Sequence, residues 1–268
     1  MQQFFFRSSP SPRPLPRGHW IVTQRWNDLL FAHWPLPPQA LALALPAELQ
    51  PDLWHGSAWL GVEPFWVDRI KFRTLPPIPG GYHLPGLNLR TYVRHRETGV
   101  PGIYQISMET GSLLIASFGR LLYHLPFHLA EMEITQRSER EFSLYCRRRF
   151  SAHRILFKAR YRGLGPTRKL AELRAGTLES FLLDRTSIFL LNRAGRPVHA
   201  NLHYVSSPLE EAEAEIEQND LPAAAGIALP ASEPVLYYTR RMAAYIWPLE
   251  PATAAMATRR VSVPVPQS

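Results

Sequence analysis

Apolar and polar residues alternate through residues 85–110, and this pattern predicts two strands joined by a turn. In the first arm, Asn88, Arg90 and Tyr92 fall on one face, and the other face carries Leu87, Leu89, Thr91 and Val93. The second arm covers 103–107, and the link between the arms is rich in Gly, Pro and charged residues, which suits an exposed loop. A row of amide, guanidinium and phenol groups inside an apolar sheet suits a polar ligand. A sheet face open to water, or an Arg that pins neighbouring strands, accounts for the same pattern.

The rest of the chain also reads as mainly β structure. Apolar runs and alternation bounded by turn residues predict further strands at 57–72, 129–137, 141–150, 154–162, 196–205 and 235–247. Helical spacing of apolar residues predicts a helix over 112–122, and a shorter helix begins near Thr177. Ser207, Pro208 and Glu210 have the spacing of a capping box, which predicts an acidic helix over 209–220 with a solvated face.

Four side chains in these elements carry further expectations. Glu63 lies inside an apolar run, so it needs a partner or a raised pKa if it is buried, and neither if it points to water. Strand alternation places Cys146 in the core and Lys158 on the outer face. His33 stands between Ala and Trp, and we expect it to be packed rather than functional.

Charge adds one feature that the apolar pattern does not show. The formal net charge is +8, and residues 137–174 hold twelve Lys or Arg against three Glu. A solvated outer sheet face explains this basic segment, and a patch that binds phosphate groups is the sharper alternative. Only three of the 30 basic residues are lysines, so an arginine bias of the whole proteome explains part of the charge.

Cysteine content and hydropathy indicate in which compartment of the cell the protein is found. Cys146 is the single cysteine, so no internal disulfide forms, and no apolar run reaches the roughly 20 residues that span a bilayer. The spacing of His and Cys predicts no metal site, since the i and i+4 pair His199 and His203 would lie about 13 Å apart on a strand. We therefore expect a cytoplasmic protein without membrane contact, built as one domain at 19–250 between disordered tails at 1–18 and 251–268.

Several blocks, taken in order, resemble a known family. These are LLFAHWPLPPQAL, WLGVEPF, PGLNLRTYV, GIYQISMETGSLLIA, YHLPFHLAEM, GTLESFLLDR, SSPLEEAEAEI and VLYYTRRMAAYIWPL, which together span about Trp20 to Glu250. They are similar to the uncharacterised YqjF-like family, which is placed in the acetoacetate-decarboxylase-like superfamily. The resemblance implies an α+β, mainly β fold: a cone-shaped antiparallel β-barrel with a few short flanking helices and a polar pocket inside.

The resemblance also bears on lysine chemistry. The segment YHLPFHLA looks like the superfamily stretch in which a lysine forms a Schiff base, and Phe127 and His128 stand where its two lysines would be. Phe127 cannot form an imine, so decarboxylation of acetoacetate by the lysine route is not expected. Asn88 and Arg90 lie in the strand that supplies the superfamily with a catalytic Glu, so that role is also in doubt. No cofactor is expected.

These observations favour a protein that binds an anionic small molecule, such as a keto acid, in a barrel pocket. Arg90 would hold the anion, Glu63 would be its internal partner, and Asn88 and Tyr92 would orient the ligand. The other candidates are Tyr104 and Tyr123 for ligand binding, and His128, His124 and Glu63 for catalysis.

Two alternatives stay open. One is a protein that binds nucleic acid or an anionic surface through residues 137–174, which is disfavoured because alternation puts most of its aromatic residues on the face opposite the arginines. The other is a non-catalytic regulatory or structural protein. Assembly into a homo-oligomer is compatible with each hypothesis.

Overall fold

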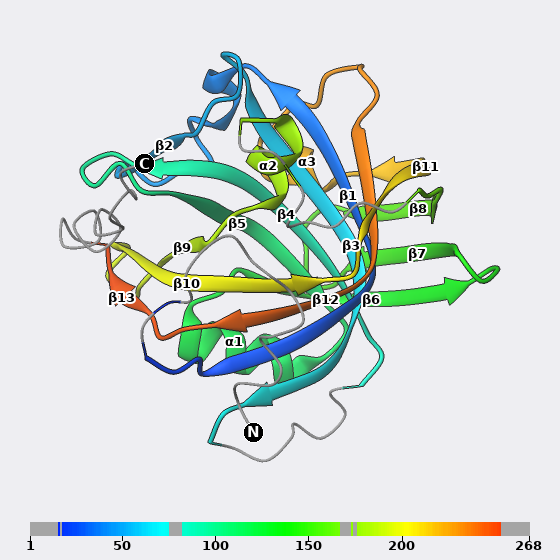
Figure 1. Cartoon of the computed structure of the whole chain (residues 1–268), viewed down its shortest axis with the longest axis horizontal. Coiled ribbons are helices and arrows are strands. Elements are labelled where there is room, and N and C mark those ends of the chain that lie inside the picture. Colours follow the sequence, from blue (N-terminus) through cyan, green and yellow to red (C-terminus); the bar gives the residue numbers. More distant parts are fainter. Residues whose placement is uncertain (1–15, 17, 75–81, 167–172, 174–175, 253–268) are drawn as a thin grey trace, which may run out of the picture.

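The computed structural model describes residues 16, 18–74, 82–166, 173 and 176–252. The two predicted tails therefore lie almost wholly outside the described residues. Thirteen strands and a few short helices make up the described chain, which confirms the predicted mainly β fold class (Figure 1). No helix in this part of the chain is long and apolar enough to cross a membrane.

The strands are β1 Val22–Leu36, β2 Leu49–Pro51, β3 Ala58–Phe72, β4 Leu84–His95, β5 Pro101–Thr110, β6 Phe127–Gln136, β7 Glu141–Arg148, β8 Leu156–Gly163, β9 Ser187–Leu191, β10 Pro197–Ser206, β11 Leu209–Asn219, β12 Val235–Ile246 and β13 Glu250–Pro251. All the strands predicted from the sequence form, and β1, β2, β11 and β13 were not predicted as strands. The helices are the 3₁₀ helix Pro38–Leu41, α1 Leu113–Tyr123, α2 Leu178–Leu183 and α3 Leu221–Ala224.

The sheet closes on itself in two rings. One ring runs β5–β6–β7–β8–β11–β12–β1–β3–β4 and returns to β5. The other runs β5–β9–β10–β12–β1–β3–β4 and also returns to β5. We call them the nine-strand ring and the seven-strand ring. They share β12, β1, β3, β4 and β5, so both faces of these shared strands are covered by protein.

Each face of the shared strands has its own core. Leu30, Leu60 and Leu89 pack with Phe142 and Phe157 of β7 and β8, inside the nine-strand ring. The opposite face packs against α2 and β10 in a second cluster that includes Phe31, Trp59, Tyr92, Leu182 and Leu202. Fully buried strands on two faces explain why β1, β3 and β4 contain so many apolar residues in sequence.

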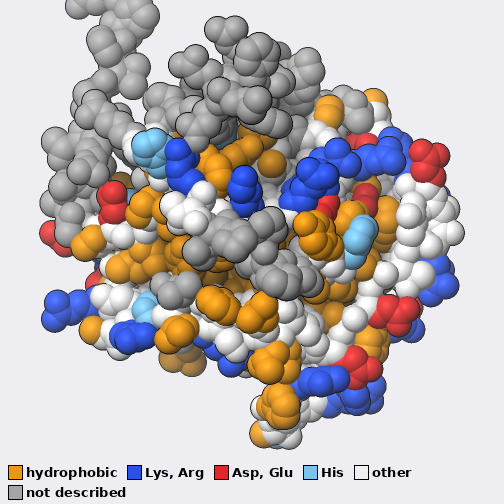
Figure 2. Space-filling model, turned by 90° about the horizontal axis from the view of Figure 1, so that it is seen from below, with side chains coloured by type: hydrophobic (Ala, Val, Ile, Leu, Met, Phe, Trp, Pro, Cys, Tyr) orange, Lys and Arg blue, Asp and Glu red, His pale blue; other side chains and the backbone are white. Residues whose placement is uncertain are grey.

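Helix α1 connects the neighbouring strands β5 and β6, which pair in parallel. Parallel strands need such a crossover connection, because a hairpin turn can join only antiparallel strands. Ser112 caps its first turn by accepting a hydrogen bond from the backbone N–H of Ile115. Large apolar side chains on α1 stay exposed, namely Leu113, Leu114, Phe118 and Leu121. Figure 2 shows the molecule from below the view of Figure 1, and hydrophobic side chains cover much of that face beside separate groups of Lys and Arg.

The predicted acidic helix over 209–220 is wrong, because this segment forms strand β11. Ala212, Ala214 and Ile216 pack against the core of the nine-strand ring, while the glutamates between them point outward. On the outer face, Arg162 pairs with Glu213 at 2.7 Å, and Lys158 pairs with Glu217. Burial of the alternate apolar residues and the cross-strand charge pairs override the local capping signal.

Two smaller predictions about these strands are confirmed. Cys146 is buried in the core of the nine-strand ring, where burial raises the pKa of its thiol. Lys158 is exposed on the outer face of β8. Lys71 lies near the end of β3, and Lys169 lies outside the described residues.

Candidate functional site

A row of polar side chains crosses the shared strands on the face inside the seven-strand ring. His33 of β1 is the register partner of Gly61 of β3, and Gly61 is the partner of Arg90 of β4. A Cβ at Gly61 would lie 3.1 Å from both Cδ2 and Nε2 of His33, and 3.4 Å from Cγ of Arg90. Glycine at this position therefore leaves the space that the imidazole and the guanidinium stem occupy.

Arg90 and Glu63 form a buried ion pair at the centre of this row. Arg90 Nη2 lies 2.7 Å from Glu63 Oε1, and the two side chains are 5% and 1% exposed. The guanidinium also lies over the ring of Phe31, 5.7 Å from its centroid, and Nη2 donates to the carbonyl oxygen of Leu182 in α2 at 3.3 Å. The predicted Glu63–Arg90 contact is thus confirmed. The hydrogen bond from Arg90 to Leu182 also connects α2 to the strands.

Burial raises the pKa of the Glu63 carboxyl, and Arg90 and the neighbouring Asn88 amide offset that effect only in part. An arginine stays protonated throughout the physiological range. Glu63 is therefore the member of this pair that can gain or lose a proton, at a pH above the ordinary range of a carboxyl.

Tyr92 connects the ion pair to His33. Arg90 Nη2 donates to the Tyr92 hydroxyl oxygen at 3.2 Å, and that hydroxyl lies 2.6 Å from His33 Nε2. The Tyr92 oxygen accepts from Arg90, and it donates to His33 Nε2 or accepts from it according to the tautomer of the imidazole. Burial, and then Arg90, hold the pKa of His33 well below its ordinary value, so this imidazole is neutral. His33 is packed as expected, but it also belongs to the polar network.

Several buried polar atoms near Arg90 have no hydrogen-bond partner within the described part of the chain. They include Arg90 Nε, His33 Nδ1 and Gln105 Oε1. Gln105 of β5 is the register partner of Arg90, and it is 4% exposed. Buried polar groups are normally paired, so donors and acceptors left unpaired around one cation indicate room for a polar ligand or for water.

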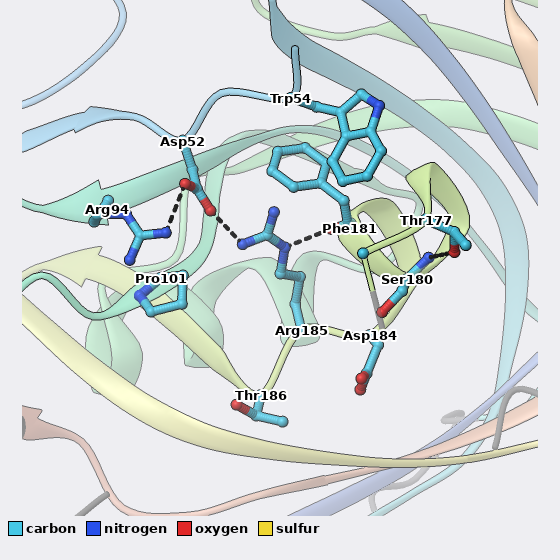
Figure 3. Close-up of a pocket in the computed structure, with 11 residues that line it drawn as sticks. Asp52, Trp54, Arg94, Pro101, Thr177, Ser180, Phe181, Asp184, Arg185 and Thr186 are labelled. Atoms are coloured by element: carbon cyan, nitrogen blue, oxygen red, sulfur yellow. Dashed lines mark hydrogen bonds and ion pairs between the residues drawn. The ribbon is translucent and has the colours of Figure 1, made fainter. Parts of the chain in front are cut away.

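A pocket opens beside α2 at the end of the seven-strand ring (Figure 3). Its volume is about 260 Å³, and it is lined by Trp54, Thr177, Ser180 and Phe181 together with charged residues. Asp52 lies between two arginines here: Oδ1 accepts from Arg94 Nη2 at 2.9 Å and Oδ2 accepts from Arg185 Nη1 at 2.6 Å. We call this the α2 pocket.

Arg185 lies between the α2 pocket and the group of Glu63, Asn88, Arg90 and Tyr92, which we call the Arg90 site. Its guanidinium stacks 4.1 Å from the Phe181 ring centroid and 5.1 Å from the Tyr92 ring centroid. Arg90 lies 5.5 Å from the same Tyr92 ring, so the phenol contacts both cations. Reasoning from the sequence identified neither Asp52 nor Arg185 as a site residue, because they meet only through contacts between segments 133 residues apart.

The other predicted site residues lie elsewhere. Tyr104 is the register partner of Thr91, and it packs against a small cluster that contains Val93 and Phe189. Tyr123 is the last residue of α1, and His124 follows as its C-cap in the left-handed conformation, with φ of 52°. The structure therefore brings together Glu63, Asn88, Arg90 and Tyr92, and it places these three residues outside that group.

The segment that resembles the lysine stretch has a structural role here. Phe127 packs on α1, where a Cβ added to Gly119 would lie 2.4 Å from the Phe127 ring. His128 is the register partner of Glu109, and Glu109 accepts two hydrogen bonds from Arg148, at 2.5 and 3.1 Å. Burial, followed by Arg148 and Arg120, lowers the pKa of His128 to about 4. A neutral imidazole results at physiological pH.

The basic segment 137–174 is partly neutralised by neighbouring strands. Arg147 pairs with Glu131 at 2.5 Å, Arg162 pairs with Glu213, and Lys158 pairs with Glu217. These pairs reduce the charge that remains for an outside anion. In the described part of the chain, no group of three His, Cys, Asp or Glu side chains is placed to hold a metal ion.

Comparison with known proteins places the chain in a family. The sequence profile of DUF2071, described as "Uncharacterized conserved protein (COG2071)", matches residues 23–243. The chain belongs to the DUF2071 family. The uncharacterized protein YqjF of Bacillus subtilis (strain 168) is 34% identical over 235 residues, which cover 88% of this chain and 94% of YqjF. The predicted YqjF-like relationship is thus confirmed.

Solved structures show the fold of this DUF2071 protein. The enduracididine biosynthesis enzyme MppR, complexed with pyruvate, matches with a TM-score of 0.60 at 11% identity, covering 92% of this chain and 96% of that one. Acetoacetate decarboxylase from Legionella pneumophila matches with a TM-score of 0.56 at 14% identity, covering 90% of each chain. At these identities the likeness shows the acetoacetate-decarboxylase-like fold.

Proposed function

We propose that this DUF2071 protein binds a small anionic metabolite of the carboxylate or keto-acid class inside the seven-strand ring, with Arg90 as the anion-binding residue. The observation that carries the proposal is a buried guanidinium whose Nε has no partner among the described residues, next to Gln105 Oε1, which has none there either. Glu63 faces Nη2 of this guanidinium, and planar guanidinium groups suit carboxylates, so a second carboxylate can bind at the same cation. MppR, which shares the fold, was solved with pyruvate, and that ligand belongs to the same chemical class.

A ligand carboxylate would compete with Glu63 for the same guanidinium. Two carboxylates beside one cation cannot both stay ionised in a buried site, and Glu63 already has a raised pKa. Glu63 would therefore take up a proton when the ligand binds. The affinity should rise as the pH falls, because the protonated form of Glu63 is the form that tolerates the bound anion.

The same arrangement supports one class of reaction. Glu63, which carries a proton when the ligand is bound, can donate it to the carbon next to the carbonyl of a bound enolate and take it back in the reverse direction, while Arg90 stabilises the enolate oxygen or the carboxylate. Schiff-base chemistry finds no support among the described lysines, since Lys71 lies near the end of β3 and Lys158 is exposed and paired with Glu217. The reaction class is thus proton exchange next to a carbonyl.

Calorimetric titration with pyruvate tests the proposal. We expect heat of binding for the natural chain and for Arg154→Met, a control in which an exposed arginine is lost. We expect no binding for Arg90→Met, and binding that no longer takes up a proton for Glu63→Gln, measured in buffers of different ionisation enthalpy. Equal pyruvate affinity in the natural chain and a folded Arg90→Met variant would disprove the assignment.

A further inference from the structure

The α2 pocket has features that the Arg90 site does not use. Arg185 is 7% exposed, and two of its three nitrogens are engaged: Nε donates to the Phe181 carbonyl oxygen at 2.6 Å and Nη1 donates to Asp52. Its third nitrogen, Nη2, is buried and has no hydrogen-bond partner among the residues that the structure describes. A charged donor in a pocket wall that has no partner among the described residues can donate to an acceptor on a ligand.

The charges around this donor favour an anion. Asp52 is shared between Arg94 and Arg185, so one carboxylate faces two guanidinium groups. Arg94 has a second acceptor, the Gly99 carbonyl oxygen at 2.6 Å, so Arg185 carries the open position. Asp184 also lines the pocket, but Figure 3 shows its carboxylate directed away from the Arg185 guanidinium.

Aromatic rings form the adjoining wall. The ring centroids of Trp54 and Phe181 lie 5.7 Å apart at an interplanar angle of 44°, and in Figure 3 the Phe181 ring lies next to the Arg185 guanidinium with the Trp54 ring beyond it. Aromatic pairs are favourable at centroid separations of about 4.5–7 Å, so this wall can receive a further ring. The volume of about 260 Å³ is slightly below the roughly 300–1,000 Å³ of pockets for drug-sized ligands, which limits the ligand to one ring with a short acidic group.

We propose that the α2 pocket is a second binding site, selective for small aromatic carboxylates and separate from the Arg90 site. The ligand carboxylate accepts from Arg185 Nη2, and its ring packs against Trp54 and Phe181. Arg94 contributes through Asp52, which it holds in place for Arg185. The proposal does not depend on the Arg90 site being occupied.

Calorimetric titration with benzoate tests the chemistry of the ligand without changing the protein. We expect benzoate to bind at least tenfold more tightly than benzamide, its neutral counterpart, since removal of a charge-assisted hydrogen bond costs about that much affinity. Inorganic phosphate, which lacks a ring, should not displace benzoate. Equal binding of benzamide, or displacement by phosphate at equal concentration, would overturn the proposal.

Variants locate the site. Arg185→Gln and Trp54→Leu should each weaken benzoate binding at least tenfold, while Arg96→Gln, which removes an exposed arginine near β4, should leave it unchanged. Thermal melting of each variant shows whether it folds. If Arg185→Gln does not fold, the affinity of Trp54→Leu for benzoate provides the test. Benzoate should still bind in the presence of saturating pyruvate. Unchanged affinity in Trp54→Leu, or displacement of benzoate by pyruvate, would show that the ligand does not occupy the α2 pocket.

Discussion

Replacement of Arg90 by Met gives the sharpest test of the buried pair. The change leaves Glu63, 1% exposed, without the cation that now lies 2.7 Å away. Removing one member of a buried ion pair costs about 3–5 kcal/mol of unfolding free energy. In a domain of this size each kcal/mol corresponds to a melting temperature lower by about 2–4 °C. We therefore expect a large destabilisation at pH 8, measured by urea unfolding followed by tryptophan fluorescence.

The dependence of this cost on pH separates the ion pair from simple loss of packing. Without Arg90, the folded-state pKa of Glu63 rises further above its unfolded value, so folding favours the protonated carboxyl. The stability of the variant is then greatest below the unfolded pKa and decreases as the pH rises through the folded pKa, by up to about 1.4 kcal/mol per pH unit. The penalty should therefore shrink between pH 8 and pH 5.

Two controls complete this experiment. The double variant Glu63→Gln/Arg90→Met should be more stable at pH 8 than Arg90→Met alone, and it should lack the pH trend, because no buried carboxyl remains. Arg154→Met, which removes an exposed arginine, should change the unfolding free energy by less than about 0.5 kcal/mol. If Arg90→Met costs less than about 1 kcal/mol and shows no pH trend, Arg90 and Glu63 are not a buried pair in solution.

Two further predictions concern the segment that resembles the lysine stretch. His128, with a pKa of about 4 in the folded chain, should destabilise the protein as the pH falls from about 6.5 to 4, since the unfolded state binds the proton first. A shift of the His128 pKa from 6.5 to about 4 corresponds to a loss of about 3.4 kcal/mol of unfolding free energy at low pH. We expect roughly half of that loss, because the ring is only half-buried and water screens its charge. His128→Gln should remove this part of the acid sensitivity, measured by urea unfolding at pH 7 and pH 4.5. Borohydride treatment with acetoacetate or pyruvate should trap no adduct, because Lys158 is exposed and paired with Glu217 and Lys71 lies near the end of β3; a stoichiometric adduct in the intact mass would contradict this.

The sequence predicted the strands well because their alternation is local. The polar row of Asn88, Arg90 and Tyr92 follows from the period of two along β4, and Glu63 was identified because a carboxylate in an apolar run needs a partner. The acidic strand β11 shows the limit of local signals. Its Glu-Ala alternation has the period of a strand, yet the capping box at its start predicted a helix, and only pairing with β8 decides between them.

The α2 pocket could not be predicted from the sequence for a different reason. Asp52 and Arg185 are 133 residues apart, and they meet only because β9 pairs in parallel with β5 and because α2 packs on the shared strands. Parallel pairing of distant segments leaves no local pattern. The same holds for Gln105, whose place beside Arg90 depends on a register shift between β4 and β5.

The strand β5 explains why the polar site lies where it does. One edge of β5 pairs with β4 along most of its length. Its other edge pairs with β9 at Ile103 and Tyr104, and with β6 from Met108 to Thr110. In the described pairings, Gln105 lies between these two neighbours, at the level where the sheet divides into its two rings. Where two neighbouring strands diverge from the same edge of a third, side chains rather than backbone hydrogen bonds fill the space between them. Ligands in proteins with sheets often bind at such points. The topology therefore places the polar group around Arg90 where the two rings separate, and no lysine of the described chain takes part in it.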